Sequence, residues 1–225
     1  MKWVARLRQA PVTSALLVIN TAVFLAMVAV SHQVLNFDAE TLAVAGASIR
    51  AQGFPFSAWR WLSAAYVHGG LLHIVMNMFV LAQIGALAEA VIGRGLFAAL
   101  YVVAGVAGFA LSYAMGAPAA KISVGASGAI MGLIGVSAVF AWRTGQGAIA
   151  RNLLTNVGFI FVVGLFANVD NYAHLGGLLV GGAVGWWRAR WTRPLPRFVD
   201  GALIGLSAAL SIAALVIVHL QAARL

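Results

Sequence analysis

The chain alternates between long uncharged, mostly apolar stretches and short segments that hold its charged residues. A helix needs about 20 apolar residues to cross the hydrocarbon of a bilayer. Seven stretches meet or approach that length: 9–31, 61–88, 95–120, 122–142, 152–169, 171–187 and 201–223. The pattern predicts an all-α polytopic membrane helix bundle with seven transmembrane helices. The fifth and sixth stretches meet at Asp170, which predicts a hairpin with a short loop.

Composition supports lipid as the main solvent of this surface. Of the 225 residues, 63% are hydrophobic and only 8% are charged, whereas a soluble domain carries roughly a quarter charged residues. The chain has no cysteine, which excludes disulfides, zinc–cysteine sites, iron–sulfur clusters and thiol nucleophiles. The candidate reactive side chains are therefore those of Ser, His, Asn and the few acids, and we expect no metal and no cofactor.

The positive charges indicate an orientation for the bundle. With the N-terminus in the cytoplasm, ten of the 14 Lys and Arg residues lie inside, as the positive-inside rule requires. These ten are Lys2, Arg6, Arg8, Arg94, Arg143, Arg151, Arg188, Arg190, Arg193 and Arg197. Seven crossings then place the C-terminus outside. The net charge of +9 therefore reports topology and indicates no nucleic-acid partner.

The first stretch has an alternative reading as a cleaved secretory signal, because basic residues precede it. Its length and the poor cleavage site at 31–33 favour a retained helix. The segment 32–60 that follows is the longest polar excursion and carries the aromatic residues Phe54, Phe56 and Trp59, with Trp61 just beyond. We interpret it as an interfacial insertion.

Polar side chains inside a membrane span need a partner or water, so they mark candidate sites. In the second stretch His68 is followed by His73 and Asn77, and the last two share a helix face. Such residues can bond an oxyanion or simply bond a neighbouring helix. No His-Glu-x-x-His pattern is present, which disfavours a metal site.

The fourth stretch contains Gly125, Ala126, Ser127 and Gly128 near its start. Small neighbours expose the Ser127 hydroxyl at a helix N-terminus, where the dipole favours a developing negative charge. The alternative is an ordinary N-cap with packing glycines.

The sixth stretch opens with His174, which shares one helix stripe with Gly177, Gly181 and Gly185. This can be a packing stripe alone. It can also dock on Gly128, Gly132 and Gly135 of the fourth stretch and bring His174 to Ser127. Both helices run from outside to inside, so both residues lie at one depth and have the arrangement of a nucleophile and general base. Because Asp170 falls in the loop, the sequence predicts a dyad.

At these residues the chain resembles the rhomboid family of intramembrane serine proteases. Four motifs occur in the family's order: Trp59-Arg60, then His68 with His73 and Asn77, then 125–128, then 173–177. The resemblance covers roughly 54–187. It implies one rhomboid-like membrane domain over 1–225, with core motifs at 54–191 and an added C-terminal transmembrane helix at 200–223, a six-plus-one arrangement.

The resemblance also implies roles for individual residues. Ser127 is the nucleophile and His174 the general base, while His73, Asn77 and the Ser127 N–H form the oxyanion hole, with Gly125 and Ala126 beside the substrate. Supporting residues are His68, Gly128, Met131, Gly177, Gly181, Trp59 and Arg60. The segment 32–60 is the membrane-embedded first loop, and the fifth span with the Asp170 loop gates substrate entry.

The implied activity is cleavage of transmembrane segments of other membrane proteins near the outer face of a bacterial cell membrane. One departure is Met131, where many family members place an aromatic ring that stacks on the catalytic histidine; a thioether gives a weaker hold. Two alternatives stay open: a non-proteolytic member that binds membrane helices, and a transporter, which the odd span count without a repeat disfavours.

Overall fold

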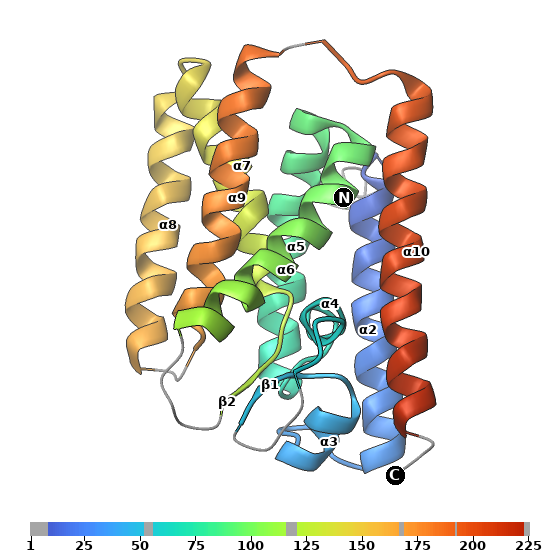
Figure 1. Ribbon diagram of the computed structural model, residues 1–225. Helices are drawn as coiled ribbons and strands as arrows, with labels where there is room; N and C mark the ends of the chain where they lie inside the picture. Colours follow the sequence, from blue (N-terminus) through green and yellow to red (C-terminus); the bar gives the residue numbers. More distant parts are fainter. Residues whose placement is uncertain (1–8, 52–55, 116–120, 167–168, 192, 223–225) are drawn as a thin grey trace.

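The computed structural model describes residues 9–51, 56–115, 121–166, 169–191 and 193–222 (Figure 1). In these parts seven long helices form one bundle: α2 Pro11–Ser31, α5 Leu71–Ile92, α6 Arg94–Met115, α7 Ser127–Arg143, α8 Gly147–Phe166, α9 Asn171–Arg190 and α10 Arg197–Ala222. Four of them, α2, α5, α6 and α10, are long and apolar enough to cross a membrane; α7 and α8 are apolar but shorter. The predicted helical membrane bundle is confirmed.

The second predicted span begins later than the sequence indicated. Helix α5 starts at Leu71, and residues 60–63 form the separate short helix α4 (Arg60–Ser63). The backbone of Gly70 passes so close to the Leu35 carbonyl that a Cβ atom would lie 2.0 Å from its oxygen. The irregular segment between the two helices is almost fully buried, which satisfies the rule that non-helical backbone at membrane depth must be covered by protein.

The all-α prediction missed a short pair of strands. Strand β1 (Ser48–Arg50) runs antiparallel to β2 (Lys121–Ser123), with Arg50 opposite Lys121 and Ser48 opposite Ser123. The fourth helix was expected from residue 122 and instead begins at Ser127. An apolar stretch interrupted by one charge does not distinguish a strand from the start of a helix by length alone.

The segment 32–60 folds back onto the bundle. Its short helix α3 (Ala39–Val44) is capped by the Asp38 carboxylate, which accepts from the Thr41 N–H. The Arg60 guanidinium lies over the Trp59 ring and donates to the carbonyls of Ala43 and Ala47 at 2.7 and 3.1 Å. The motif Trp59-Arg60 therefore holds this segment together. Phe54, part of the predicted aromatic cluster, lies outside the described residues.

Phe56 and Trp61, two of the aromatic residues noted in the sequence, are in contact. Their ring centroids are 5.2 Å apart, and both pack on Tyr113 near the end of α6, at 5.3 and 5.9 Å. This aromatic contact joins the first loop to the helical bundle.

Helices α7 and α9 pack with their backbones in contact, as the glycine stripes predicted. A Cβ atom on Gly177 would lie 1.9 Å from the Gly128 carbonyl oxygen, and one on Gly181 would lie 1.9 Å from that of Gly132. No side chain fits at either position. This close approach brings the first turns of the two helices together.

A buried acid fixes the start of α2. Glu89 of α5 is 4% exposed and accepts from the Val12 and Thr13 N–H groups and from the Thr13 hydroxyl, at 3.2, 2.8 and 2.7 Å. These N–H groups belong to the first turn, which has no acceptor within its own helix. Glu89 therefore caps α2 from a neighbouring helix.

The last helix is tied to the bundle near its start and at its middle. Near its start the Asp200 carboxylate accepts from the Gly95 N–H at 2.8 Å. Further along, the Ser211 hydroxyl lies 2.7 Å from that of Tyr66, a side chain that is 1% exposed. Helix α10 thus contacts α6 and the buried segment just ahead of α5.

Candidate active site

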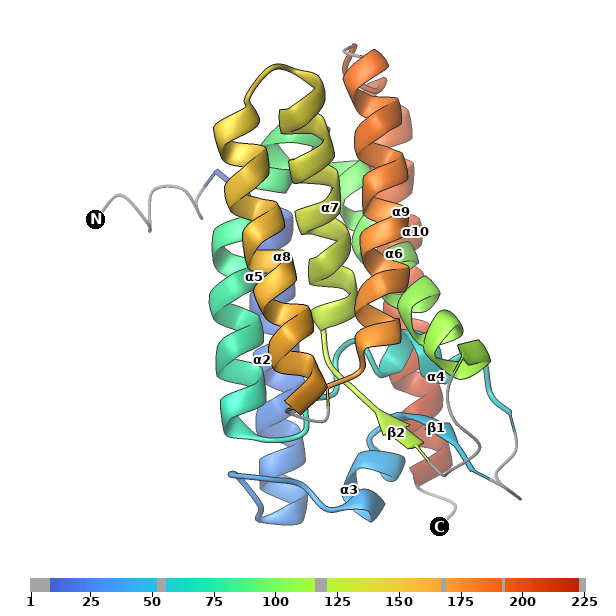
Figure 2. The ribbon, with the colours of Figure 1, turned by 90° about the vertical axis from the view of Figure 1, so that its left-hand side faces the viewer.

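Ser127 and His174 form a direct hydrogen bond. The Ser127 Oγ lies 2.9 Å from the His174 Nε2. Ser127 is the first residue of α7 and His174 lies in the first turn of α9, and both helices begin at the same end of the bundle (Figure 2). The distance is within reach for proton transfer between a nucleophile and its base.

The N-terminus of α7 supplies backbone donors beside the hydroxyl. The residue before it, Ala126, has helical φ and ψ, and its carbonyl accepts the first intrahelical bond, from Ile130. The N–H groups of Ser127 and Gly128 come earlier and have no acceptor within the helix. They are available to a negatively charged oxygen.

Gly125 is the position where the chain needs glycine most clearly. Its φ is +120°, and a Cβ atom there would lie 2.7 Å from the His73 Nε2 and 3.8 Å from the Ser127 Oγ. Because Gly125 has no side chain, the space between the His73 ring and the Ser127 hydroxyl stays open.

The hydrogen bonds of His73 fix which nitrogen carries its proton. The Gly69 N–H donates to the His73 Nδ1 at 3.2 Å, so Nδ1 holds a lone pair. In a neutral imidazole the other nitrogen is then the donor. His73 therefore presents an Nε2–H toward Gly125 and the start of α7.

The other two polar residues of this region lie around His73. The His68 side chain is fully buried, and its ring meets that of His73 edge-on with centroids 5.3 Å apart. The Asn77 amide donates to the His73 carbonyl one turn earlier, at 2.9 Å. Asn77 is thus bonded within its own helix, and its contribution to an oxyanion hole stays a prediction.

His174 has an aromatic neighbour that the sequence did not indicate. The Phe161 ring of α8 meets the imidazole edge-on, with centroids 6.1 Å apart and an interplanar angle of 82°. The Asn171 amide donates to the Phe161 carbonyl at 3.2 Å and ties α8 to the start of α9. Met131 is fully buried in α7. The aromatic ring that meets His174 in the described residues thus comes from α8, while residue 131 of α7 is a methionine.

Asp170 lies where the sequence placed it, just before α9, but is better connected than expected. It caps the helix by accepting from the Ala173 N–H at 3.1 Å, and it pairs with Lys121 at 3.0 Å. Burial raises the pKa of this carboxyl, but hydrogen bonds from Ser112, Ser123 and Lys121 lower it by more, so the net shift is downward. Asp170 therefore stays ionised as the partner of these groups.

The structure brings some predicted residues to the dyad and places others elsewhere. His73, Gly125, Ala126, Gly128 and Gly177 lie around it or directly support it, while Gly181 packs one turn further along α9. Trp59 and Arg60 bind the first loop, as described above. Among the described residues no group of three or more His, Asp or Glu side chains is placed to hold a metal ion.

The protein is thus a polytopic helical membrane protein in which a serine and a histidine are hydrogen-bonded, as in the sites of serine hydrolases. The Rhomboid domain family matches residues 55–191. The chain belongs to the rhomboid family.

Its curated relatives come from plants, bacteria and fungi. RHOMBOID-like protein 5 of Arabidopsis thaliana is 36% identical over 57% of this chain and 43% of its own length. Rhomboid protease GluP of Bacillus subtilis is 32% identical over 64% of this chain and 29% of its own. Rhomboid-type serine protease 2 of Emericella nidulans is 29% identical over 68% and 31%. The chain thus matches less than half the length of each relative.

Proposed function

We propose that this protein is an intramembrane serine endopeptidase that hydrolyses transmembrane segments of other membrane proteins near the outer membrane face. The observation that carries the proposal is the 2.9 Å hydrogen bond between the Ser127 hydroxyl and the His174 imidazole, at the paired starts of two closely packed helices. Membership of a family whose relatives include proteins named as serine proteases supports it.

The proposed reaction has two steps. The His174 Nε2 takes the proton of Ser127 while Oγ attacks the carbonyl carbon of the scissile peptide bond. The carbon–nitrogen bond then breaks, the amine leaves with the proton from His174, and an acyl-enzyme forms. In the second step His174 takes a proton from water while the water oxygen attacks the acyl carbon. The bond between that carbon and the Ser127 Oγ then breaks, His174 returns the proton to Oγ, and the acid leaves.

The negative oxygen of each tetrahedral intermediate needs donors. We assign this role to the His73 Nε2–H and to the backbone N–H of Ser127; the bond from the Gly69 N–H to the His73 Nδ1 supports the assignment of His73. We also assign Asn77 to this group, on condition that its amide turns away from the His73 carbonyl when a substrate binds. Fixed donors of this kind account for a large share of the rate in acyl transfer.

A helical substrate hides its carbonyls in its own hydrogen bonds. The segment to be cut must therefore unwind, which favours Gly and Pro near the cut because both weaken a helix. We place substrate entry at α8 and the loop before α9, and we assign the first loop, residues 32–60, to the outer membrane face.

The dyad is tested by labelling and cleavage in the same preparation. A serine-directed fluorophosphonate should label the wild type and fail to label Ser127→Ala, and cleavage of a transmembrane substrate should be lost in both Ser127→Ala and His174→Ala. Ser137 is a buried serine of α7 whose hydroxyl donates to the Leu133 carbonyl, so Ser137→Ala is the matched control. Cleavage by Ser127→Ala at the wild-type rate would refute the proposal.

The same experiment distinguishes the protease from a non-proteolytic protein that binds membrane helices. That alternative predicts retention of membrane helices by wild type and Ser127→Ala alike, with no fluorophosphonate labelling of either.

We further propose a bacterial cell membrane with a cytoplasmic N-terminus, and an added C-terminal helix at 200–223 within one domain. Because the chain has no cysteine, single cysteines can report its orientation. A membrane-impermeant maleimide added to intact cells should label Gln33→Cys and leave Gln146→Cys unlabelled; the reverse pattern would refute the orientation.

A further inference from the structure

The Asp170 carboxylate is held by four donors. Its Oδ2 accepts from the hydroxyls of Ser112 and Ser123, each at 2.5 Å, and its Oδ1 lies 3.0 Å from the Lys121 Nζ and accepts from the Ala173 N–H. The side chain is 12% exposed. Charge-assisted hydrogen bonds of this kind are stronger and shorter than neutral ones.

These donors come from separate elements that meet at the site. Ser112 lies near the end of α6, Lys121 and Ser123 form the ends of β2, and Ala173 lies in the first turn of α9. Ser123 stands four residues before Ser127, and Asp170 stands four residues before His174. The Ser123–Asp170 bond thus joins the two segments that lead into the dyad.

The segment between Ser123 and Ser127 forms neither helix nor strand. Ala126 packs in the core, and the Gly125 N–H donates to the Ala64 carbonyl at 2.9 Å. On its other side the segment continues from Ser123, so the bond between Ser123 and Asp170 is the link that joins it to the start of α9.

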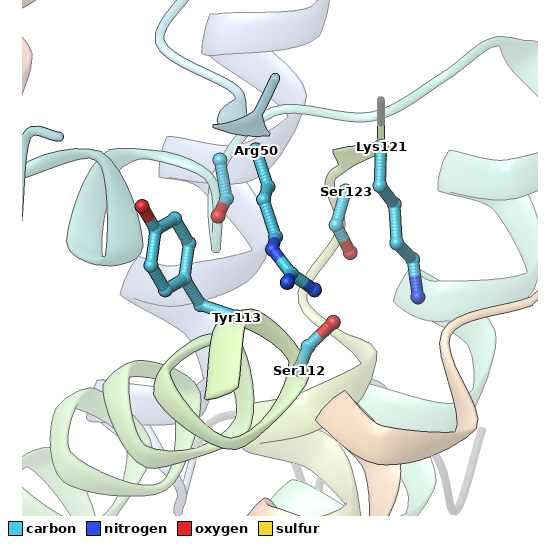
Figure 3. Close-up of a pocket in the computed structure, with 6 residues that line it drawn as sticks. Arg50, Ser112, Tyr113, Lys121 and Ser123 are labelled. Atoms are coloured by element: carbon cyan, nitrogen blue, oxygen red, sulfur yellow. The ribbon is translucent and has the colours of Figure 1, made fainter. Parts of the chain in front are cut away.

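The neighbourhood of this bond is polar and positively charged. Ser112, Lys121 and Ser123 line a shallow pocket together with Arg50 and Tyr113, and the Arg50 side chain points toward the two serines (Figure 3). An anionic side chain at residue 170 suits these surroundings better than a neutral one.

Asp170 does not act as a third member of a triad. Its oxygens bond the four donors above, and in the described parts of the chain no group pairs with the His174 Nδ1. The Asp170 carboxylate therefore makes no hydrogen bond to the dyad, and its structural link to the two residues runs through the backbone segments that it connects.

We propose that Asp170 is a positioning residue that ties the segment leading into α7 to the start of α9, and so keeps the Ser127 Oγ and the His174 Nε2 within hydrogen-bond distance. This inference rests on the proposed protease function. It adds to that function a residue that touches neither the substrate nor the reacting atoms.

The first test replaces the carboxylate by an amide. Asp170→Asn can still cap α9 but loses the ion pair with Lys121 and one of the two acceptor oxygens. In vesicles, we expect kcat and the rate of fluorophosphonate labelling to fall about tenfold, with KM within about twofold of wild type. The matched control is Asp38→Asn, because Asp38 caps α3 in the same way and should leave both rates unchanged.

The second test separates positioning from general stability. Ser112 and Ser123 donate to the same oxygen at the same distance, but only Ser123 lies on the segment that leads to Ser127. Ser123→Ala should slow labelling clearly more than Ser112→Ala, and combining Ser123→Ala with Asp170→Asn should cost little more than Asp170→Asn alone. Equal effects of the two serines, or fully multiplicative effects of Ser123→Ala and Asp170→Asn, would overturn the proposal.

The outcomes also distinguish this inference from the proposed function. If Ser127→Ala is inactive while Asp170→Asn matches the wild type, only the positioning role fails. If Ser127→Ala cleaves normally, the protease assignment fails first. Should Asp170→Asn not fold, as judged by circular dichroism and thermal unfolding, the comparison of the two serine variants decides.

Discussion

The Phe161 ring on α8 supports the His174 imidazole edge-on, with centroids 6.1 Å apart and planes at 82°. The ring hydrogen atoms of one partner face the π-electrons of the other, and pairs of this kind contribute about 0.5–1.5 kcal/mol beyond the area that they bury. Phe161 is therefore a restraint on the orientation of the proposed base.

Replacing this ring should lower turnover. In Phe161→Leu the imidazole loses its edge-on neighbour, and we expect kcat to fall about three- to tenfold, with the folded protein retained. Cleavage of a reconstituted transmembrane substrate measures it. Phe198→Leu on α10 is the control, because Phe198 is 78% exposed and lies outside the proposed entry site; equal losses in both variants would contradict the role of Phe161.

Substitutions at His73 and Gly125 should lower kcat in a non-additive way. His73→Ala removes a fixed donor, and loss of one oxyanion donor costs about 10²–10³ in kcat. Gly125→Ala forces a Cβ atom against the His73 Nε2 and strains a backbone with φ +120°, so we expect a loss of similar size. Steady-state kinetics of the double variant should show little further loss, because both changes remove the same donor.

Gly205→Ala is the control for the glycine substitution. A Cβ atom at Gly205 meets nothing within 4 Å, so turnover should stay at the wild-type level. Independent, multiplicative losses in His73→Ala and Gly125→Ala would show that the two residues act separately.

The cap on α2 predicts a loss of stability without a loss of chemistry. Glu89→Ala leaves the Val12 and Thr13 N–H groups buried without their acceptor, at a cost of about 1–3 kcal/mol. Thermal unfolding in detergent should show a lower midpoint, while the fluorophosphonate labelling rate at low temperature is unchanged. A normal midpoint in Glu89→Ala would mean that other groups cap α2.

Stability at low pH should depend on Asp170. The folded-state pKa of its carboxyl lies below the usual value, since the hydrogen bonds from Ser112, Ser123 and Lys121 outweigh the effect of burial. A lowered folded pKa contributes stability above the unfolded value, about 3.9, and that contribution is lost as the pH falls through the folded pKa. Unfolding midpoints should therefore fall less steeply on acidification below about pH 4 in Asp170→Asn than in the wild type. Identical acid profiles would contradict this.

The sequence could predict the bundle and the contact between Ser127 and His174 because the signals for both are local. Uncharged stretches of membrane length mark the helices, and the glycines that follow Ser127 and His174 at helical spacing mark the two that touch. The strands β1 and β2 could not be predicted, because each has three residues and depends on a partner far away in the chain.

Two features of the site were also missed for physical reasons. Phe161 is one of 12 phenylalanines, and its contact with His174 depends on how α8 packs on α9. Asp170 carried a signal that was available, a conspicuous acid four residues before a candidate base, but the serines that bind it have no pattern in the sequence.

The glycine contacts between α7 and α9 have a mechanical consequence for catalysis. The carbonyls of Gly128 and Gly132 sit one turn apart against Gly177 and Gly181, so the register of one helix against the other is fixed at two successive turns. A shift of one turn would move Ser127 by about 5.4 Å relative to His174 and break the hydrogen bond between them. The distance between the Ser127 hydroxyl and the His174 imidazole is therefore set along the length of both helices, and we expect a bulky residue at Gly181 to separate the two side chains without touching either.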